Sequence, residues 1–207
     1  MKKLYLNIRD IEVDGRPEDV LPKPINSIDI SVEEFFTQTE TMRRIIYKHC
    51  GANQGRQYKK AFNSITIFSH ELFDMSVILN DVQNQVAKFA NKCINFEDTN
   101  VYLSPPRHHS VNLSDIPIHT GVVYFELDGM LEVRDGIKKY VSEGEHTVAN
   151  LKRQTENLRS VWHDTQFNDY QEMVTEVCDK IKIAISELHE YEVYLTKKIN
   201  DLVGSGS

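Results

Sequence analysis

The sequence has few of the residues that interrupt helices or build disulfide frameworks. Its 207 residues include 6 prolines, 9 glycines and 3 cysteines. A low content of helix breakers leaves room for long helices. The cysteines form no C-x-x-C pair and their number is odd, which disfavours both a disulfide framework and a zinc knuckle. A protein of a reducing compartment is the simplest interpretation.

Long apolar runs and an excess of basic residues are also missing. No stretch approaches the ~18 apolar residues of a membrane-spanning helix. The N-terminal lysines are not followed by the apolar run of a Sec signal peptide. A formal net charge of −7 disfavours non-specific nucleic-acid binding, which depends on Lys and Arg. We expect a cytoplasmic protein, or one exported without a Sec signal peptide, with no membrane span and no nucleic-acid partner.

The first thirty residues are the least helical part of the pattern. Alternating apolar residues over 3–13 predict a short N-terminal β segment. Pro22 and Pro24 then favour extended chain to about Ile28, because the residue before a proline avoids the helical region.

The rest of the chain predicts a mainly α fold. Ser31 is a candidate N-cap for a helix that ends near His49. Three longer helices are expected over residues 56–95, 128–160 and 165–202. We expect them to form long antiparallel hairpins of a bundle-like or coiled-coil-like kind.

Two of these helices carry an apolar stripe, or seam, at heptad spacing. On the helix 56–95 its ten members are alternately four and three residues apart: Ala61, Ile65, Phe68, Leu72, Met75, Leu79, Val82, Val86, Phe89 and Cys93. On the last helix the seam consists of Phe167, Val174, Cys178, Ile181, Ile185, Leu188, Leu195, Ile199 and Leu202. This heptad pattern is typical of helices that pack against other helices along their whole length. A single helix cannot bury such a stripe alone. On the last helix we expect Ile181, Leu188 and Leu195 to lie in the seam as structural or interface residues.

Residues 97–121 predict a linker between two halves. They contain Pro105, Pro106, Pro117 and Gly121, which interrupt helices and strands. We therefore expect an N-terminal domain over 1–108, with the β segment and one hairpin, and a second hairpin over 109–203. Residues 204–207 have the composition of an added tail. The halves resemble each other after a shift of 109 residues. This similarity is explained either by duplication or by the ease of aligning any two heptad helices.

The predicted turn between the last two helices contains the chain's single tryptophan. Trp162 can fold over the open end of a hairpin and bury a large area. Asp164 can cap the next helix by accepting hydrogen bonds from its free N–H groups. Phe167 then begins the apolar seam. These three residues are the candidate structural or interface residues of the turn.

This arrangement resembles the WXG100 or ESAT-6-like superfamily of helical hairpins. The resemblance covers residues 123–203 and rests on the two long helices, Trp162 and Phe167. Asp164 stands where the family has the glycine of its W-x-G motif. The resemblance implies a four-helix bundle formed by two hairpins, and traffic through a type VII-like secretion system in a bacterium.

The family's C-terminal secretion signal, a tyrosine followed four residues later by an acid, is absent from this sequence. Tyr191 is followed at that distance by Leu195, and Tyr194 by Lys198. The sequence therefore departs from the family at the feature that bears most directly on secretion.

No motif for catalysis is present. Phosphate-binding loops, dinucleotide fingerprints, the G-x-S-x-G nucleophile elbow and H-E-x-x-H are all missing. His108, His109 and His119 are the only candidates for a metal site, but adjacent side chains of an extended chain point apart, so a solvated loop is the simpler alternative. We expect no catalytic, cofactor-binding or metal-ligating residues.

Three functions remain open at this stage. The first is a non-enzymatic helical module that pairs with a protein partner, or with itself as a homodimer, through its helical seams. The second is an acidic immunity or antitoxin-like protein that neutralises a basic partner, since the net charge of −7 would attract one. The third is an enzyme or nucleotide-binding protein with an unrecognised site in residues 97–121.

Overall fold

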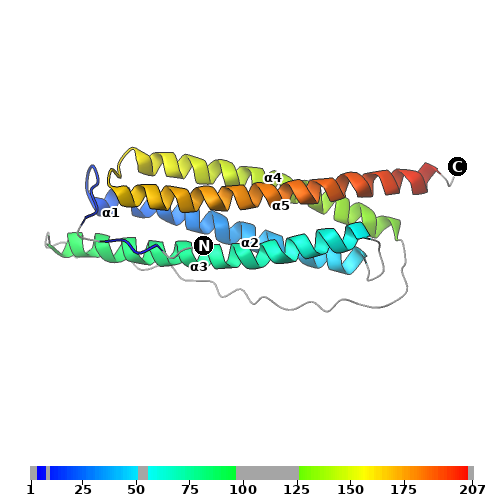
Figure 1. Cartoon of the computed structure of the whole chain (residues 1–207), viewed down its shortest axis with the longest axis horizontal. Helices are drawn as coiled ribbons and strands as arrows, with labels where there is room; N and C mark the ends of the chain where they lie inside the picture. Colours follow the sequence, from blue (N-terminus) through cyan, green and yellow to red (C-terminus); the bar gives the residue numbers. More distant parts are fainter. Residues whose placement is uncertain (1–3, 8–9, 51–55, 97–125, 205–207) are drawn as a thin grey trace. The chain divides into compact units, whose positions relative to one another are not determined.

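The chain is mainly α-helical, as the sequence predicts. The computed structural model describes residues 4–7, 10–50, 56–96 and 126–204. Within these ranges, one short helix and four long helices follow each other along the chain (Figure 1). Their bounds are α1 Pro17–Val20, α2 Pro22–Cys50, α3 Arg56–Phe96, α4 Leu127–Arg159 and α5 Thr165–Gly204.

The bounds of α3, α4 and α5 agree with the prediction to within two residues, whereas the start of α2 was predicted wrongly. The helix begins at Pro22 rather than near Ser31, and residues 22–28 are helical rather than extended. A proline is tolerated in the first turn of a helix because its missing N–H would have no partner there. Ser31 consequently lies inside α2, where its hydroxyl donates to the carbonyl of Ser27 at 2.8 Å.

The N-terminal β segment is not confirmed. Within residues 4–7 and 10–16 the structure has no strand, and the β-type pairing is one isolated antiparallel bridge between Val13 and Trp162. The predicted linker, residues 97–121, lies outside the described residues, and so do its histidines His108, His109 and His119.

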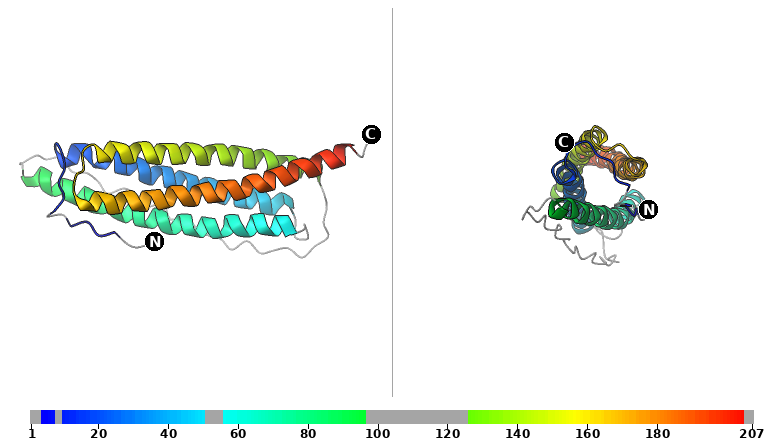
Figure 2. Two further views of the ribbon diagram at one scale, coloured as in Figure 1. Left: turned by 45° about the horizontal axis from the view of Figure 1, so that its top comes forward. Right: turned by 90° about the vertical axis from the view of Figure 1, so that its left-hand side faces the viewer.

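The chain divides into two compact units, and each takes a segment from each of the four long helices. Figure 2 shows the course of these helices in two further views. Unit 1 comprises residues 1–34, 72–110 and 147–179, and unit 2 comprises 35–71, 111–146 and 180–207. The division of the sequence at residue 108 into two hairpin domains stays a prediction.

The core of both units consists of the apolar stripes that the sequence displays. On α3 the predicted seam is buried from Ala61 to Phe89, and Cys93 is partly exposed. On α5 the seam is buried from Phe167 to Ile199, whereas Leu202 near the C-terminal end of the helix is exposed. Burial of such stripes supplies most of the stability of long helices in water.

In unit 2, contacts join the helix segments in antiparallel pairs. Between α2 and α3, residue 40 contacts residue 69 and residue 47 contacts residue 62. Between α2 and α4, residue 39 contacts residue 140 and residue 49 contacts residue 132. The pairs Glu71–Lys180 and Lys60–Glu190 join α3 to α5 at 2.8 and 3.3 Å, and Lys138–Glu192 joins α4 to α5 at 3.7 Å.

A buried ion pair lies at the α2–α3 seam of unit 2. The Arg43 guanidinium donates to both carboxylate oxygens of Glu40, at 3.1 and 2.8 Å. The hydroxyl of Ser69 on α3 also donates to Glu40. All three side chains are buried. Buried charges require such pairing and hydrogen bonding, so this cluster fixes how α2 and α3 align.

In unit 1, α2 and α3 are also joined by polar side chains. The Gln83 amide donates to Asn26, and Asn80 donates to Asp29 at 3.3 Å. On the other side of α2, Asn150 of α4 donates to the hydroxyl of Ser31 at 2.7 Å. These side-chain pairs fix the register of α2 against α3 and α4 in unit 1.

Two glycines of α4 in unit 2 differ in the space around them. A Cβ atom at Gly144 would lie 2.6 Å from Cγ2 of Ile185 and 3.1 Å from the ring of Phe35. A Cβ atom at Gly136 would lie 3.5 Å from the Met42 side chain, which is an ordinary contact. Gly144 therefore allows α4 to approach α5 and α2 closely, and Gly136 has no such role.

We expect Gly144→Ala and Gly136→Ala to change stability in opposite directions. Alanine at Gly136 should stabilise the protein by up to about 1 kcal/mol, because alanine is the better helix former. Alanine at Gly144 should destabilise it by about 1–3 kcal/mol through overpacking against a stiff β-branched side chain. Urea unfolding followed by circular dichroism measures both. A stabilising Gly144→Ala would contradict the close packing described here.

Among the described residues, no helix has a segment sufficiently long and apolar to cross a membrane. This finding agrees with the expectation from the sequence.

Candidate functional site

The α4–α5 turn brings Trp162, Asp164 and Phe167 together in unit 1. Oδ1 of Asp164 accepts a hydrogen bond from the backbone N–H of Gln166 at 2.7 Å, and its backbone carbonyl accepts one from the N–H of Phe167 at 3.3 Å. These bonds satisfy free donors at the start of α5. Asp164 is therefore the N-terminal cap of α5, as the sequence predicts.

The second oxygen of the Asp164 carboxylate holds the tryptophan. Oδ2 accepts a hydrogen bond from the indole Nε1 of Trp162 at 2.7 Å. A buried indole N–H needs such a partner, and a carboxylate is a stronger acceptor than a neutral group. One side chain thus caps the helix and fixes the orientation of the ring.

Trp162 is buried among aromatic rings at the start of α5. Only 1% of its surface is exposed. Its ring centroid lies 5.9 Å from that of Phe167 and 5.8 Å from that of Tyr170. Burial raises the pKa of the Tyr170 hydroxyl well above its usual value, and the nearby Asp29 carboxylate adds to this rise. Tyr170 therefore remains neutral over the physiological pH range.

The N-terminal segment binds to this turn through its backbone, a feature that the sequence did not predict. The N–H of Asp14 donates to the carbonyl of Val161 at 2.7 Å, and the N–H of His163 donates to the carbonyl of Glu12 at 2.9 Å. The N–H of Glu12 also donates to Oδ2 of Asp164 at 2.8 Å. Asp164 therefore connects the turn, α5 and the N-terminal segment.

Two glutamine side chains hold the beginning of the same segment. The Gln85 amide on α3 accepts from the N–H of Leu6 at 2.7 Å and donates to the carbonyl of Leu4 at 3.0 Å. The Gln166 amide pairs in the same way with both backbone groups of Asn7. Each glutamine side chain forms hydrogen bonds to backbone N–H and C=O groups that a neighbouring strand would form in a sheet. The extended residues are therefore held without a sheet.

The seam candidates Ile181, Leu188 and Leu195 lie in unit 2. All three are buried, with at most 2% of their surface exposed. In this conformation they contribute to the core and are not accessible to a second chain. The turn residues Trp162, Asp164 and Phe167 belong to unit 1 instead.

Within the described ranges, no group of three His, Cys, Asp or Glu side chains could hold a metal ion. Comparison of the chain with protein-family models, with curated proteins and with solved structures finds no match in any of the three.

We expect Asp164→Ala to destabilise the protein by about 2–4 kcal/mol. The variant loses the α5 cap, which contributes about 0.5–2 kcal/mol, and it leaves the buried indole N–H without a partner, which costs about 1–3 kcal/mol. Asp164→Asn, which retains an acceptor, should lose less. The exposed Asp169→Ala serves as the control. Chemical denaturation monitored by circular dichroism measures the differences, and equal stabilities of Asp164→Ala and Asp169→Ala would contradict the described role.

Proposed function

We propose that this chain is a non-enzymatic helical module that binds another protein in association with a type VII-like secretion system. The observation that carries the proposal is the α4–α5 turn, where Asp164 both caps α5 and binds the indole of Trp162. A buried tryptophan at the turn of two long helices is the feature on which the WXG100 resemblance rests. Asp164 stands at the position of the family's glycine, and its hydrogen bonds to the start of α5 and to Trp162 are compatible with a closed turn between the two helices.

We further propose that α2–α3 and α4–α5 are two helical hairpins in one chain. Together they would take the place of the two-hairpin dimer that the resemblance implies. The antiparallel contacts of all four helix segments in unit 2 support this arrangement. Burial of Ile181, Leu188 and Leu195 supports it too, because these seams have no free apolar face for a second copy.

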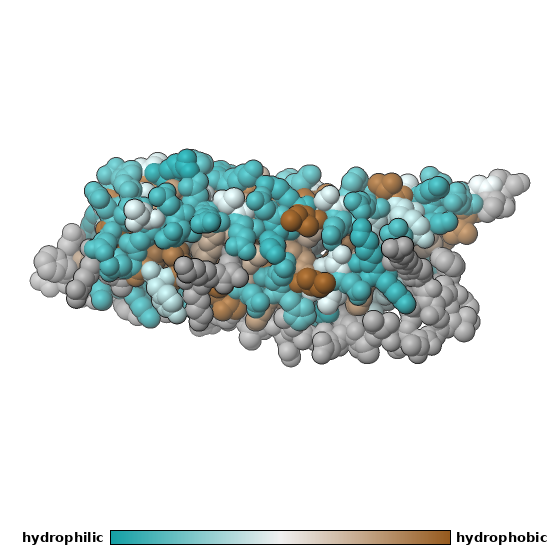
Figure 3. Space-filling view, viewed as in Figure 1, coloured by the Kyte–Doolittle hydropathy of each residue, from teal (hydrophilic) through white to brown (hydrophobic). Residues whose placement is uncertain are grey.

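On this proposal the partner is a different protein that binds the outer faces of the helices. Figure 3 shows a mainly hydrophilic face with separate hydrophobic spots rather than a continuous patch. The exposed large apolar side chains include Ile67, Ile183 and Val193. Scattered side chains of this kind are normal on a surface, and they suit a partner that makes a mixed polar and apolar contact.

A photo-crosslinking amino acid at exposed Ile183 tests the proposal in the native host. We expect a cross-link to one partner, and a complex of the purified proteins whose Kd changes little with salt. A cross-link only to further copies of the chain, or none at all, would contradict the proposal. Deletion of the host's type VII secretion ATPase separately tests the secretion part, because unchanged export would remove it.

An acidic immunity or antitoxin-like protein is the second candidate. Asp169, Glu172 and Glu176 are exposed on α5 at helical spacing, and no cation of the described part of the chain pairs with them. Such a stripe would attract a basic partner and speed its association.

Salt dependence separates the two candidates. If the chain neutralises a basic protein, Kd should rise steeply between low and moderate salt, and Glu172→Lys with Glu176→Lys should abolish binding. If the first proposal holds, the charge-reversed variant should bind about as well as the wild type. The exposed Asn157→Lys serves as a matched control outside the stripe.

A further inference from the structure

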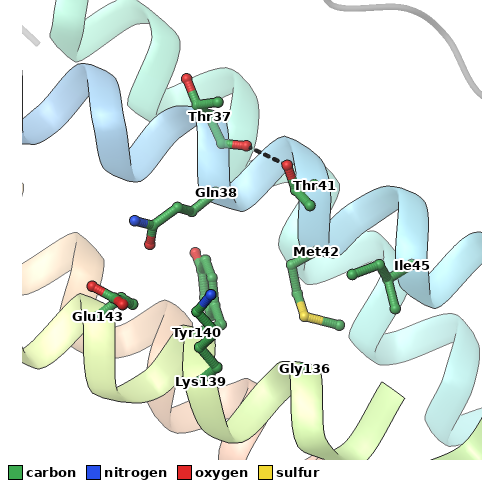
Figure 4. A pocket seen from close by; sticks show the side chains of 9 residues that line it. All are labelled: Thr37, Gln38, Thr41, Met42, Ile45, Gly136, Lys139, Tyr140 and Glu143. Atoms are coloured by element: carbon green, nitrogen blue, oxygen red, sulfur yellow. Dashed lines mark hydrogen bonds between the residues drawn. The ribbon is translucent and has the colours of Figure 1, made fainter. Parts of the chain in front are cut away.

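We propose that a groove between α2 and α4 in unit 2 is a binding site for a small aromatic molecule that carries one hydrogen-bond donor. The groove has a volume of about 250 Å³. Met42, Ile45 and the ring of Tyr140 supply its apolar surface, and Lys139 and Glu143 lie at its rim (Figure 4). This combination of an apolar interior with a few polar groups is typical of small-molecule sites.

The groove exists because α4 has no side chain at Gly136, opposite Met42. The nearest atoms to a Cβ built there are Cε and Sδ of Met42, both at 3.5 Å. A larger side chain at this position would extend into the space that the groove now occupies. The residue at position 136 therefore contributes to the volume of the groove.

The wall opposite is fixed by contacts of Tyr140. The Tyr140 hydroxyl forms a hydrogen bond of 2.8 Å with Thr39, and its ring stacks on Phe35 with a centroid distance of 4.9 Å. Both residues belong to α2 and unit 2. Only 3% of the Tyr140 surface is exposed, so these contacts give this wall of the groove a fixed shape before a ligand binds. A preformed wall lowers the entropic cost of binding.

Gln38 supplies the groove with a hydrogen-bond acceptor that is available to a ligand. The Thr41 hydroxyl donates to the carbonyl of Thr37 at 2.9 Å and is thereby satisfied (Figure 4). The Gln38 Oε1 atom is buried and accepts no hydrogen bond from any residue that the structure describes. Because a buried acceptor without a donor is costly, a ligand N–H or O–H at this point would be favoured.

The size of the groove sets the size of the ligand. A cavity of about 150 Å³ is sufficient for benzene in an engineered apolar core. A groove of about 250 Å³ accommodates a bicyclic ring. Indole meets both requirements, because it is bicyclic and carries one N–H donor, so it is the probe of choice. Indene has the same shape and lacks the donor. This site is independent of the protein partner proposed above.

Methyl NMR on the full chain with ¹³C-labelled methionine tests the proposal. The chain has 5 methionines, and Met42→Leu identifies the Met42 signal. We expect indole at millimolar concentration to shift the Met42 methyl and to leave the signals of Met75 and Met173, which belong to unit 1, unchanged. Indole should bind about threefold to tenfold more tightly than indene, as one hydrogen bond implies.

Two variants complete the test. Gln38→Met should weaken indole binding to the level of indene, and Gly136→Leu should abolish the Met42 shift by filling the groove. The exposed Ile67→Ala, outside the groove, should bind indole like the wild type. No Met42 shift, equal shifts of all methionines, or equal affinities of the wild-type protein for indole and indene would each overturn the proposal. Gln38→Met keeps the test valid if Gly136→Leu does not fold.

Discussion

Trp162→Ala should lower the free energy of unfolding by about 3–5 kcal/mol, which is the cost of removing a large aromatic side chain from a core. The indole is 1% exposed, contacts the rings of Phe167 and Tyr170, and donates to Asp164. Its removal leaves a cavity and takes away the hydrogen bond that orients the Asp164 carboxylate. Guanidinium unfolding followed by circular dichroism measures the change, because the variant has no tryptophan fluorescence.

Two further variants show whether the loss of stability is specific to the large ring of Trp162. Trp162→Phe retains part of the packing and should lose less than Trp162→Ala. Tyr194→Ala removes an aromatic side chain that is 37% exposed on α5, and it should change stability little. A loss below about 1 kcal/mol for Trp162→Ala would contradict the role of the ring as the clamp of the turn.

Arg43→Met should destabilise the protein by about 3–5 kcal/mol, because it leaves the carboxylate of Glu40 buried without its cation. Both side chains of the pair are buried, with 3% and 6% of their surface exposed. Ser69 would still donate to the carboxylate, but one neutral hydroxyl cannot replace a bidentate guanidinium.

The double variant Glu40→Leu with Arg43→Met is the matched comparison for the buried pair. It removes both charges together, so its stability should lie close to that of the wild type. The coupling energy from this cycle should exceed about 1 kcal/mol. If the changes in the free energy of unfolding for the two single substitutions simply add up in the double variant, the two side chains do not interact as described. The exposed pair of Lys60 with Glu190 should contribute less than 1 kcal/mol, roughly, in the same experiment.

Helix positions were predictable where the apolar pattern is regular. The ten-residue stripe of α3 fixed both the helix and its buried face, because burial along a long helix requires that spacing. The start of α2 is harder to predict, because Pro22 and Pro24 also favour extended chain. Proline is compatible with the first turn, where α2 places both residues.

The polar seam between α2 and α3 has the same period as the apolar one but was not predicted. Asn26 and Glu40 of α2 are two heptads apart, and so are their partners Gln83 and Ser69 of α3. A search for apolar residues alone does not detect buried polar pairs. Single polar residues on a helix also look like solvated surface until a partner on another helix is known.

At the turn, the burial of Trp162 and the capping of α5 by Asp164 were predictable, because they involve neighbours in sequence. The docking of the N-terminal segment was not. It depends on backbone groups of Glu12, Asp14 and Val161, and every residue has such groups. The sequence therefore contains no signal that would distinguish this contact from any other.

Solution mass by multi-angle light scattering over a range of concentrations is the most direct test of the central claim, that one chain closes its own helical seams and presents its outer faces to a different protein. We expect a monomer of 24.0 kDa at all concentrations. A stable dimer of twice that mass at low concentration would contradict it, because the seams or outer faces would then be occupied by a second copy of the chain.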